Sequence, residues 1–463
     1  MPNKIKSTAS GVRVRMYRHG LGDCFLLRFP RTNGKPFHVV IDSGVLKGTS
    51  DPKIRMREVA EDIRSETGGK IDALIVTHEH WDHVSGFTEA RDVWEQMKIA
   101  QVWLAWTENP ANALAEKLRK ERADKKAGIK KKIAALAGSS ALRLDAERGA
   151  RIDSLLGFLG MGLSAAEEGQ GGTKGALDFI TRHAKKRNYY KPGTSFVPTG
   201  VPGLRIFVLG PPEDEKKIKK SDPSKAHPEV YSDPSHAFAF SGTDEAADAD
   251  DDAPFGAGQG RAVADAAGYD KLFQEFFPKH TDPAWRRLGL DGMADLERLA
   301  LNLDGDTNNT SLALAFELGD GRVLLFPADA QVGNWLSWQD HAWKVKSKTI
   351  RADDLLARTV LYKVGHHGSH NATLKEHGLE KMMHRDLLAL VPVNKAMAAK
   401  KKWKMPFAPL HKRLKEKTRG RVVLADATEL LPKADQLAAL TATERKQFER
   451  SVTTTELFID VML

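Results

Sequence analysis

The chain has 463 residues, a formal net charge of +10 and a single cysteine, Cys24. One cysteine excludes an intrachain disulfide and a cysteine-rich zinc module. The basic balance favours an anionic partner, such as nucleic acid, a phosphorylated small molecule or an anionic membrane surface. No stretch of about twenty apolar residues occurs, and the N-terminus lacks an apolar signal segment, so we expect a soluble, cytoplasmic protein.

The N-terminal part of the chain alternates predicted strands with a helix. Residues 12–17, 24–29 and 38–41 have the apolar or alternating character of strands, and residues 55–67 have that of a helix. Residues 71–76 form a mostly apolar run that is too short for a helix, which predicts a buried strand. This order of elements is typical of an α/β fold.

A group of potential metal ligands follows this strand directly. The segment THEHWDH contains His78, His80, Asp82 and His83. Neutral imidazoles and ionised carboxylates are ligands for divalent metals. His78 and His80 are two residues apart and point the same way in an extended chain, whereas Asp82 and His83 follow where the chain can turn toward a second ion. A solvated histidine-rich turn is the alternative, but the position behind a buried strand predicts a metal site.

Two large insertions are predicted in the middle of the chain. Residues 109–200 are predicted to form a basic helical insertion, and residues 213–302 a second insertion that includes a helical segment. Within the second, residues 241–262 are rich in Asp, Ala and Gly and are predicted to be a disordered acidic loop. The basic residues of the first insertion are Lys117, Arg119, Lys120, Arg122, Lys125, Lys126, Lys130, Lys131 and Lys132. Such a charge run is more often a solvated surface than a binding face.

Strand patterns resume after the second insertion. Residues 311–317 and 322–326 predict a strand pair, because the Asp-Gly between them is a hairpin signal. Further strands are expected at residues 360–364, 387–393, 421–424 and 457–462.

Residues 400–404 place a tryptophan inside a lysine cluster. Trp403 could stack on a base of a single-stranded nucleic acid, although packing in the protein is an equal alternative. The candidate nucleic-acid contacts are Lys400, Lys401, Lys402, Trp403 and Lys404.

The segment THEHWDH resembles the HxHxDH signature of the metallo-β-lactamase-fold hydrolases. Six further stretches are similar to the branch that contains the soluble hydrolase domain of the DNA-uptake competence protein ComEC: RHGLGDCFLLRF, VVIDSG, VLGPP, NNTSLALAF, LLFPADA and YKVGHHGSH. The resemblance implies an α/β fold of the metallo-β-lactamase type, an αββα sandwich of two mixed sheets flanked by helices. Residues 1–463 would form this single domain, with the helical insertions added to it.

The resemblance also implies a site for two divalent ions, Zn²⁺ or Mn²⁺. It assigns His78 and His80 to the first ion, Asp82 and His83 to the second, and Asp329 to a bridge between them. Many hydrolases of this fold place a further histidine where this chain has the turn Asn308-Asn309-Thr310-Ser311. The first site would then have fewer strong ligands, and an asparagine oxygen could contribute to it. Such an oxygen-rich set makes Mn²⁺ as credible as Zn²⁺.

The GHHGSH turn is expected to supply the last ligand and groups that face the substrate. His366 and His367 are adjacent, so a strand-end geometry points them apart and only one faces the metals. We expect His366 to be the ligand. His367 and Ser369 are expected to act on the substrate, together with Asp82 in proton transfer, whereas His370 is as readily a surface residue.

Four further positions have an expected role. Asp42 matches a carboxylate that orients a metal-binding histidine, and Asp23 could act similarly or simply form a turn. Cys24 is expected to be a small core residue. Ala328 replaces the usual glycine before the bridging aspartate and is expected to change little.

The predicted function is that of a metal-dependent hydrolase, most specifically a phosphodiesterase or nuclease that acts on DNA or RNA through metal-activated hydroxide. Two alternatives stay open. The first is a hydrolase of a small substrate, such as a cyclic nucleotide, a phosphocholine ester or a lactone. The second is an effector of a multi-protein bacterial system that a protein partner activates through the insertions.

Overall fold

The structure, a computed structural model, describes residues 11–137, 146–161, 172–224, 228–231, 290–401, 403–426 and 430–463. The predicted acidic loop at residues 241–262 and the candidate contact Lys402 lie outside the described residues.

The first sheet joins the two ends of the described chain. Its strand order is β18-β19-β1-β2-β3-β5-β7-β8, and β19 pairs antiparallel with β1. The strands are β1 (Arg13–Tyr17), β2 (Phe25–Phe29), β3 (Phe37–Ile41), β5 (Ala73–Ile75), β7 (Gln101–Ala105), β8 (Lys186–Tyr190), β18 (Val452–Thr454) and β19 (Phe458–Met462).

The second sheet is built from the later half of the chain. Its order is β17-β16-β15-β12-β11-β10-β9, and β11 and β12 pair antiparallel as the hairpin signal predicts. β12, β15, β16 and β17 run parallel to one another, so this sheet is mixed. The strands are β9 (Ser195–Phe196), β10 (Leu204–Val208), β11 (Leu314–Leu318), β12 (Val323–Phe326), β15 (Thr359–Lys363), β16 (Leu388–Val391) and β17 (Val422–Leu424).

The two sheets pack face to face over an apolar core. The rings of Phe25 and Phe326 meet edge to face at 5.5 Å, and those of Phe29 and Phe316 stack at 5.9 Å. Helices α1 (Pro52–Thr67), α3 (Gly86–Glu89), α4 (Arg91–Trp94) and α8 (Gly172–His183) cover the outer face of the first sheet. Helices α14 (Val332–Ser337), α15 (Ala352–Ala357) and α17 (Ala408–Lys417) cover that of the second. The predicted αββα sandwich is confirmed.

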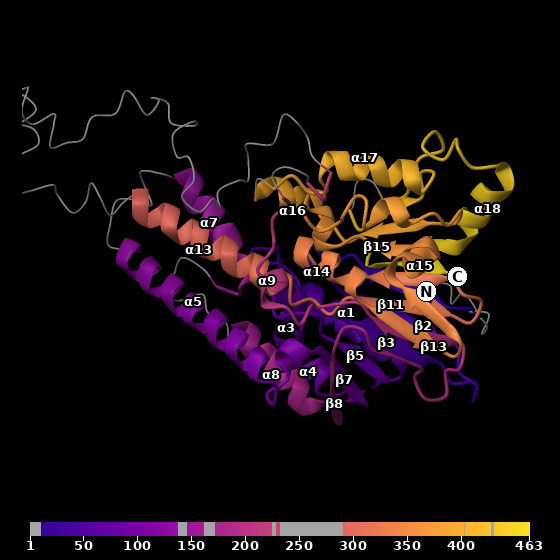
Figure 1. The fold of residues 1–463 in the computed structure, drawn as a ribbon, viewed down its shortest axis with the longest axis horizontal. Coiled ribbons are helices and arrows are strands. Elements are labelled where there is room, and N and C mark those ends of the chain that lie inside the picture. Colours follow the sequence, from indigo (N-terminus) through magenta and orange to yellow (C-terminus); the bar gives the residue numbers. More distant parts are fainter. Residues whose placement is uncertain are drawn as a thin grey trace, which may run out of the picture.

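The insertions contribute a helical layer at one side of the sandwich, where Figure 1 shows α5 (Ala113–Ala137), α7 (Ala146–Phe158) and α13 (Leu290–Asn308) together. They share an apolar cluster that includes Ile129, Ile152 and Leu296. The predicted boundaries at 109–200 differ from the structure, because β8 and β9 lie within that range and pair with the two sheets.

The remaining elements are short or peripheral. They are β4 (Lys70–Ile71), β6 (Lys98–Ile99), α2 (Trp81–Val84), α9 (Glu215–Ile218), β13 (Ala342–Val345), β14 (Lys348–Arg351), α16 (Lys395–Lys400), α18 (Ala442–Ser451) and the 3-10 helices η1 (Trp106–Glu108), η3 (Trp338–Asp340), η4 (His366–Gly368) and η5 (Leu379–Lys381). Among the described helices, none has both the length and the apolar character needed to cross a membrane.

Candidate metal centre

Parallel pairing of β3 and β5 brings two polar strand ends together. Asp42 follows β3 and Thr77 follows β5, and the Asp42 carboxylate accepts hydrogen bonds from the Thr77 N–H at 2.8 Å and hydroxyl at 2.6 Å. The other neighbour of this carboxylate is Nδ1 of His83, at 2.8 Å. Asp42 therefore takes the position that the sequence predicts, beside a histidine of the HxHxDH segment.

The second sheet supplies the other half of the centre in the same way. Asp329 follows β12, and His366 and His367 follow β15, which runs parallel to β12. The backbone N–H of His366 donates to Oδ1 of Asp329 at 3.0 Å, which ties the two strand ends together.

Four buried side chains from these strand ends form one cluster. Asp82, His83, Asp329 and His367 each offer a ligand atom, and these atoms lie within 4.8 Å of one another. Nε2 of His83 is 3.0 Å from Oδ2 of Asp329, and Nε2 of His367 is 2.9 Å from Oδ2 of Asp82. Two ligands bound to one tetrahedral zinc ion at about 2.0–2.1 Å lie roughly 3.4 Å apart, so the cluster has the dimensions of a metal site.

The structure brings His367 rather than His366 into this cluster, which differs from our expectation. Nδ1 of His366 instead lies 3.0 Å from the hydroxyl of Ser369, and the two adjacent imidazole rings are 6.0 Å apart. Both histidines have left-handed backbones, with φ values of 43° and 52°. The alternation of side chains along an extended strand therefore does not apply here. The catalytic roles of Asp82, His367 and Ser369 stay predictions.

His78 and His80 form a second converging pair. Nε2 of His78 and Nδ1 of His80 are 3.1 Å apart, close to the spacing of two nitrogens on one ion. Nδ1 of His78 lies 3.3 Å from the hydroxyl of Ser311, which also accepts the N–H of Asp329. Ser311 is thus the residue of the Asn-Asn-Thr-Ser turn that contacts the centre most directly.

The two asparagines of this turn have different surroundings. Asn308 donates to Oδ2 of Asp304 at 3.1 Å, and its own Oδ1 is buried without a hydrogen-bond partner among the described residues. Asn309 accepts the backbone N–H groups of Gln331 and Asn334 and donates to the carbonyl of Lys220. Asn309 therefore holds the start of α14, a structural role that the sequence did not predict.

Buried polar atoms without a partner and the types of donor present both indicate a cation at this cluster. Oδ1 of Asp82, Nε2 of His80 and Nε2 of His366 are buried and have no hydrogen-bond partner within the described chain. Buried polar atoms are rarely left unpaired unless a water or an ion occupies the position. The donor set of imidazoles and carboxylates suits a divalent ion such as Zn²⁺ or Mn²⁺.

The pKa values of the histidines fall into two groups. Burial lowers the pKa of His80 to about 3 and that of His366 to about 4, so both imidazoles are neutral and able to ligate at pH 7. Burial also lowers the pKa of His83, but the carboxylates of Asp329 and Asp82 outweigh it and raise the pKa well above the usual value. Without an ion, His83 carries the positive charge that these carboxylates require.

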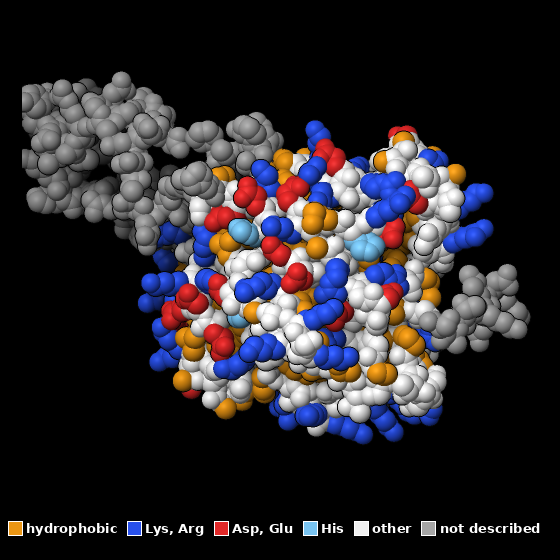
Figure 2. Space-filling model, turned by 45° about the vertical axis from the view of Figure 1, so that its right-hand side comes forward, with side chains coloured by type: hydrophobic (Ala, Val, Ile, Leu, Met, Phe, Trp, Pro, Cys, Tyr) orange, Lys and Arg blue, Asp and Glu red, His pale blue; other side chains and the backbone are white. Residues whose placement is uncertain are grey.

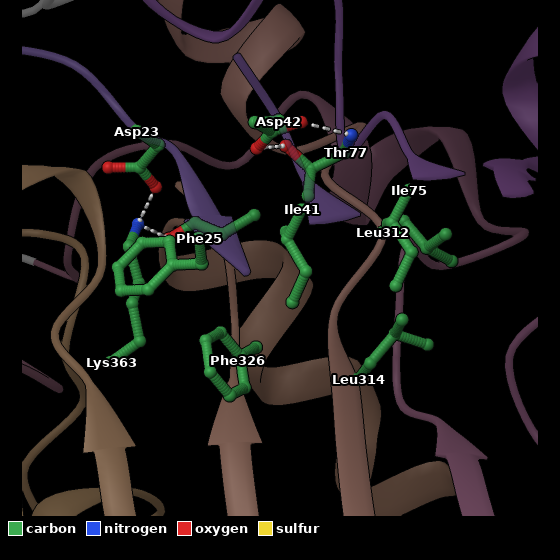
Figure 3. A pocket seen from close by; sticks show the side chains of 11 residues that line it. Asp23, Phe25, Ile41, Asp42, Ile75, Thr77, Leu312, Leu314, Phe326 and Lys363 are labelled. Carbon is green, nitrogen blue, oxygen red and sulfur yellow. Dashed lines mark hydrogen bonds and ion pairs between the residues drawn. The ribbon is translucent and has the colours of Figure 1, made fainter. Parts of the chain in front are cut away.

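Two buried charged residues of the centre were not predicted in this role. Lys363, at the end of β15, places Nζ 3.1 Å from Oδ1 of Asp329 and 2.5 Å from Oδ2 of Asp23. Figure 3 shows Lys363 and Asp23 on one side and Asp42 and Thr77 on the other, above the apolar side chains of a small cavity between the sheets. Lys363 belongs to the YKVGHHGSH stretch. Its position shortly before the two histidines was the sequence signal that could have indicated this role.

Asp304 is the second unpredicted group. It lies on α13, and its Oδ1 is 3.6 Å from Nε2 of His80. Its carboxylate is buried, and burial together with the charges of Asp82 and Asp329 raises its pKa well above the usual value. Nothing in the local sequence marked this residue, because it comes from the inserted helix.

Two smaller expectations can be compared with the structure. Cys24 is buried in the apolar core and burial raises the pKa of its thiol, in agreement with a packing role. Ala328 has a φ of 54°, a left-handed conformation that costs a non-glycine residue roughly 1–2 kcal/mol. The replacement of glycine therefore strains the backbone beside Asp329, whereas we expected little change.

The basic helix α5 pairs several of its cations with acidic side chains of neighbouring segments. Lys117 pairs with Glu215 at 2.7 Å, Lys125 with Asp306 at 2.5 Å, and Lys126 with Glu79 at 3.1 Å. Arg122 also pairs with Glu79, and with Glu108. Since Glu79 lies between His78 and His80, Arg122 and Lys126 anchor the HxHxDH segment to α5.

The candidate nucleic-acid contacts near α16 are partly occupied by protein. The ring of Trp403 stacks on Phe158 of α7 with centroids 4.7 Å apart, and Lys401 is 3.6 Å from Asp153 of the same helix. Phe158 in turn lies 6.0 Å from His80 and 5.8 Å from His366. Trp403 therefore belongs to an aromatic cover over the centre. Lys400 and Lys404 are exposed.

Comparison with known proteins gives one match. The model of the Metallo-beta-lactamase superfamily matches residues 18–100, a range that contains Asp23, Asp42 and the HxHxDH segment. Neither a curated protein nor a solved structure matches the chain. The match indicates a metal-dependent hydrolase, and the buried cluster agrees with binding of divalent metal. Asp329, Lys363 and His367 lie beyond the matched range, so the family match does not bear on them, and their place in the centre rests on the geometry.

Proposed function

We propose that this chain is a metal-dependent phosphodiesterase that cleaves DNA or RNA and binds two divalent ions, Zn²⁺ or Mn²⁺. The observation that carries the proposal is the convergence of the HxHxDH segment with Asp329 and His367 at one edge of the sandwich. His78 and His80 would hold the first ion, and Asp82, His83 and His367 the second, with Asp329 between them.

The bound ions would lower the pKa of a water molecule and stabilise negative charge on the phosphate. Oδ2 of Asp82 accepts from His367 and its Oδ1 is unpaired, so this carboxylate can also accept a proton. Ser369 fixes the ring of His366 through Nδ1 and leaves Nε2 without a partner. In this proposal, His366 takes the substrate-side role at the phosphate.

A nucleic-acid substrate is supported by the net charge of +10 and by the similarity of six stretches to the ComEC-type hydrolase domain. Figure 2 shows no continuous basic groove on the face in view, because the Lys and Arg side chains there are interspersed with Asp and Glu. Binding would then depend on many dispersed cations, and its affinity should fall steeply with salt.

A second candidate, hydrolysis of a small substrate, is favoured by the burial of the centre. His80, Asp82, His83 and His367 have no exposed surface, and Phe158 covers the approach from the side of α7. A small ester can reach the centre through a narrower opening than a polynucleotide can. A protein partner that displaces α7 would reconcile this burial with a polymeric substrate.

Salt dependence of hydrolysis separates the two candidates. The full chain, loaded with Zn²⁺ or Mn²⁺, is assayed on labelled single-stranded DNA and on bis(p-nitrophenyl) phosphate between 50 and about 200 mM salt. We expect DNA cleavage that declines by at least about tenfold over this range while the small ester changes little. Hydrolysis of the ester or of cyclic nucleotides, without any polymer cleavage at low salt, would favour the small-substrate hydrolase instead.

A further inference from the structure

The helix α13 approaches the metal centre with one buried carboxylate. Oδ1 of Asp304 and Nε2 of His80 face each other at 3.6 Å, and neither atom has a hydrogen-bond partner among the described residues. The other carboxylate oxygen, Oδ2, accepts from Nδ2 of Asn308 one helical turn later. Asn308 therefore fixes the carboxylate and leaves the oxygen that faces His80 free to accept.

The other imidazoles of the centre each have one nitrogen held by the protein. Nδ1 of His83 faces Asp42 at 2.8 Å, and Nδ1 of His367 faces the carbonyl of Pro392 at 2.7 Å. Nδ1 of His78 lies beside the hydroxyls of Thr77 and Ser311. In each case the opposite nitrogen, Nε2, points toward the candidate ion.

His80 has the reverse orientation. Its Nδ1 faces Nε2 of His78 at 3.1 Å, so Nε2 is the nitrogen that points away from the first ion. Asp304 is the acidic group beside that nitrogen. A carboxylate that accepts the outer N–H of a ligating histidine fixes its tautomer and raises its basicity as a ligand.

We propose that Asp304 is a positioning residue for the first metal ion, which accepts the Nε2–H of His80 and thereby directs Nδ1 of His80 to that ion. The inference rests on the proposed metal-dependent function and extends it, because it makes the inserted helix α13 part of the metal centre. It would also support an ion at the first site, where residues 308–311 supply no further histidine ligand.

Metal binding to the full-length, metal-free protein tests this inference without any substrate. Zn²⁺ and, separately, Mn²⁺ are titrated calorimetrically, and the bound metal is counted by mass spectrometry after gel filtration. We expect two ions in the wild type. In Asp304→Ala, one of them should bind at least about tenfold more weakly while the other keeps its affinity.

Two further variants separate positioning from folding. Asp304→Asn keeps the shape and an acceptor oxygen but removes the charge, so its affinity for the weakened ion should lie between those of wild type and Asp304→Ala. Asp306→Asn is the matched control on the same helix, because Asp306 pairs with Lys125 rather than with a histidine of the centre. It should bind both ions as the wild type does.

The inference is overturned if Asp304→Ala and Asp304→Asn bind both ions with wild-type affinity, or if they weaken both ions equally. Site-selective loss in a protein that cleaves no phosphodiester would keep the inference and remove the proposed substrate. Cleavage of DNA by the wild type, with unchanged metal binding in both variants, would keep the proposed substrate and remove the inference.

Discussion

Nζ of Lys363 lies 3.1 Å from Oδ1 of Asp329, and both side chains are about 1 % exposed. The same ammonium group is 2.5 Å from Asp23, so one buried cation serves two buried carboxylates. Because Oδ1 of Asp329 is held by Lys363 and by the N–H of His366, its Oδ2 is the oxygen available to metal ions. Lys363 thus fixes which oxygen of Asp329 would act as the proposed bridge.

Replacement of Lys363 by methionine should strongly destabilise the metal-free protein. Removal of one partner from a buried ion pair typically costs 3–5 kcal/mol, and we expect a loss of about this size in the free energy of unfolding. Urea denaturation of the metal-free protein measures it. Lys381→Met is the control, since Lys381 pairs with Asp353 at an exposed site and its loss should cost less than about 1 kcal/mol. Equal effects of the two substitutions would contradict the account.

Asp42→Asn should weaken metal binding without unfolding the chain. Asp42 has a φ of 56°, which asparagine tolerates better than most residues, so the backbone can keep its conformation. Loss of the charged partner of His83 should reduce affinity for the second ion by about 10–100-fold. Calorimetric titration with Zn²⁺ measures this, with Asp62→Asn as a control whose carboxylate binds Arg15 outside the centre. Unchanged affinity in Asp42→Asn would show that Asp42 does not support His83 as a ligand.

Binding of the second ion should release protons and become tighter as pH rises. In the metal-free protein, neighbouring carboxylates raise the pKa of His83 well above the usual value despite burial, and hydrogen bonding to Asp82 likewise raises that of His367. Both imidazoles must be neutral to bind a metal. Calorimetry near pH 7 in buffers of different ionisation enthalpy counts the released protons. No release at this pH would contradict the assigned ligands.

The same shifts fix the pH dependence of metal-free stability. A histidine whose pKa is raised on folding contributes its full stabilisation below its unfolded pKa of about 6.5, and this contribution is lost as pH rises through the folded pKa. The metal-free protein should therefore lose part of its stability on the alkaline side of neutrality, whereas metal-loaded protein should not. Thermal unfolding between about pH 7.5 and about 9 measures the difference, because the histidines with lowered pKa values, His80 and His366 among them, change the stability only at lower pH. A metal-free protein that gains stability over this range would contradict it.

Trp403→Ala should affect stability before it affects nucleic-acid binding. The stack on Phe158 is a contact within the protein, and an aromatic pair contributes about 0.5–1.5 kcal/mol beyond the area that it buries. Trp403→Phe should retain most of this stabilisation. Urea denaturation and binding of labelled single-stranded DNA are measured on both variants. Unchanged stability with lost DNA binding in Trp403→Ala would instead support a base-stacking role.

The sequence predicted those parts of the centre whose spacing is local. The HxHxDH segment behind a buried strand required only a short-range pattern, whereas the expected role of Asp42 came from the family resemblance. The choice between His366 and His367 could not be made this way, because both adopt left-handed backbones to which strand alternation does not apply. The contact of Asp304 with His80 could not be predicted from the sequence, because it depends on how the inserted helix α13 packs against the sandwich.

The fold, like the centre, was predictable where local sequence patterns determine it and not where tertiary pairing does. Strand and hairpin signals indicated most strands of the two sheets, and the resemblance indicated how the sheets pack. The strand β8, rich in lysine, arginine and tyrosine, looked like the end of the basic insertion, yet it pairs in parallel with β7 at the sheet edge. Its partner lies far back in the chain, and only tertiary pairing makes it a strand.

The proposed function of this centre is hydrolysis of phosphodiesters in nucleic acid. The most direct measurement is cleavage of labelled single- and double-stranded DNA and RNA with added Mn²⁺ or Zn²⁺, beside the double variant Asp82→Ala/His83→Ala. We expect cleavage by the wild type that disappears in the variant and on removal of the metal with a chelator. Cleavage that persists in the variant, or a wild type that binds two ions and cleaves none of these polymers, would contradict it.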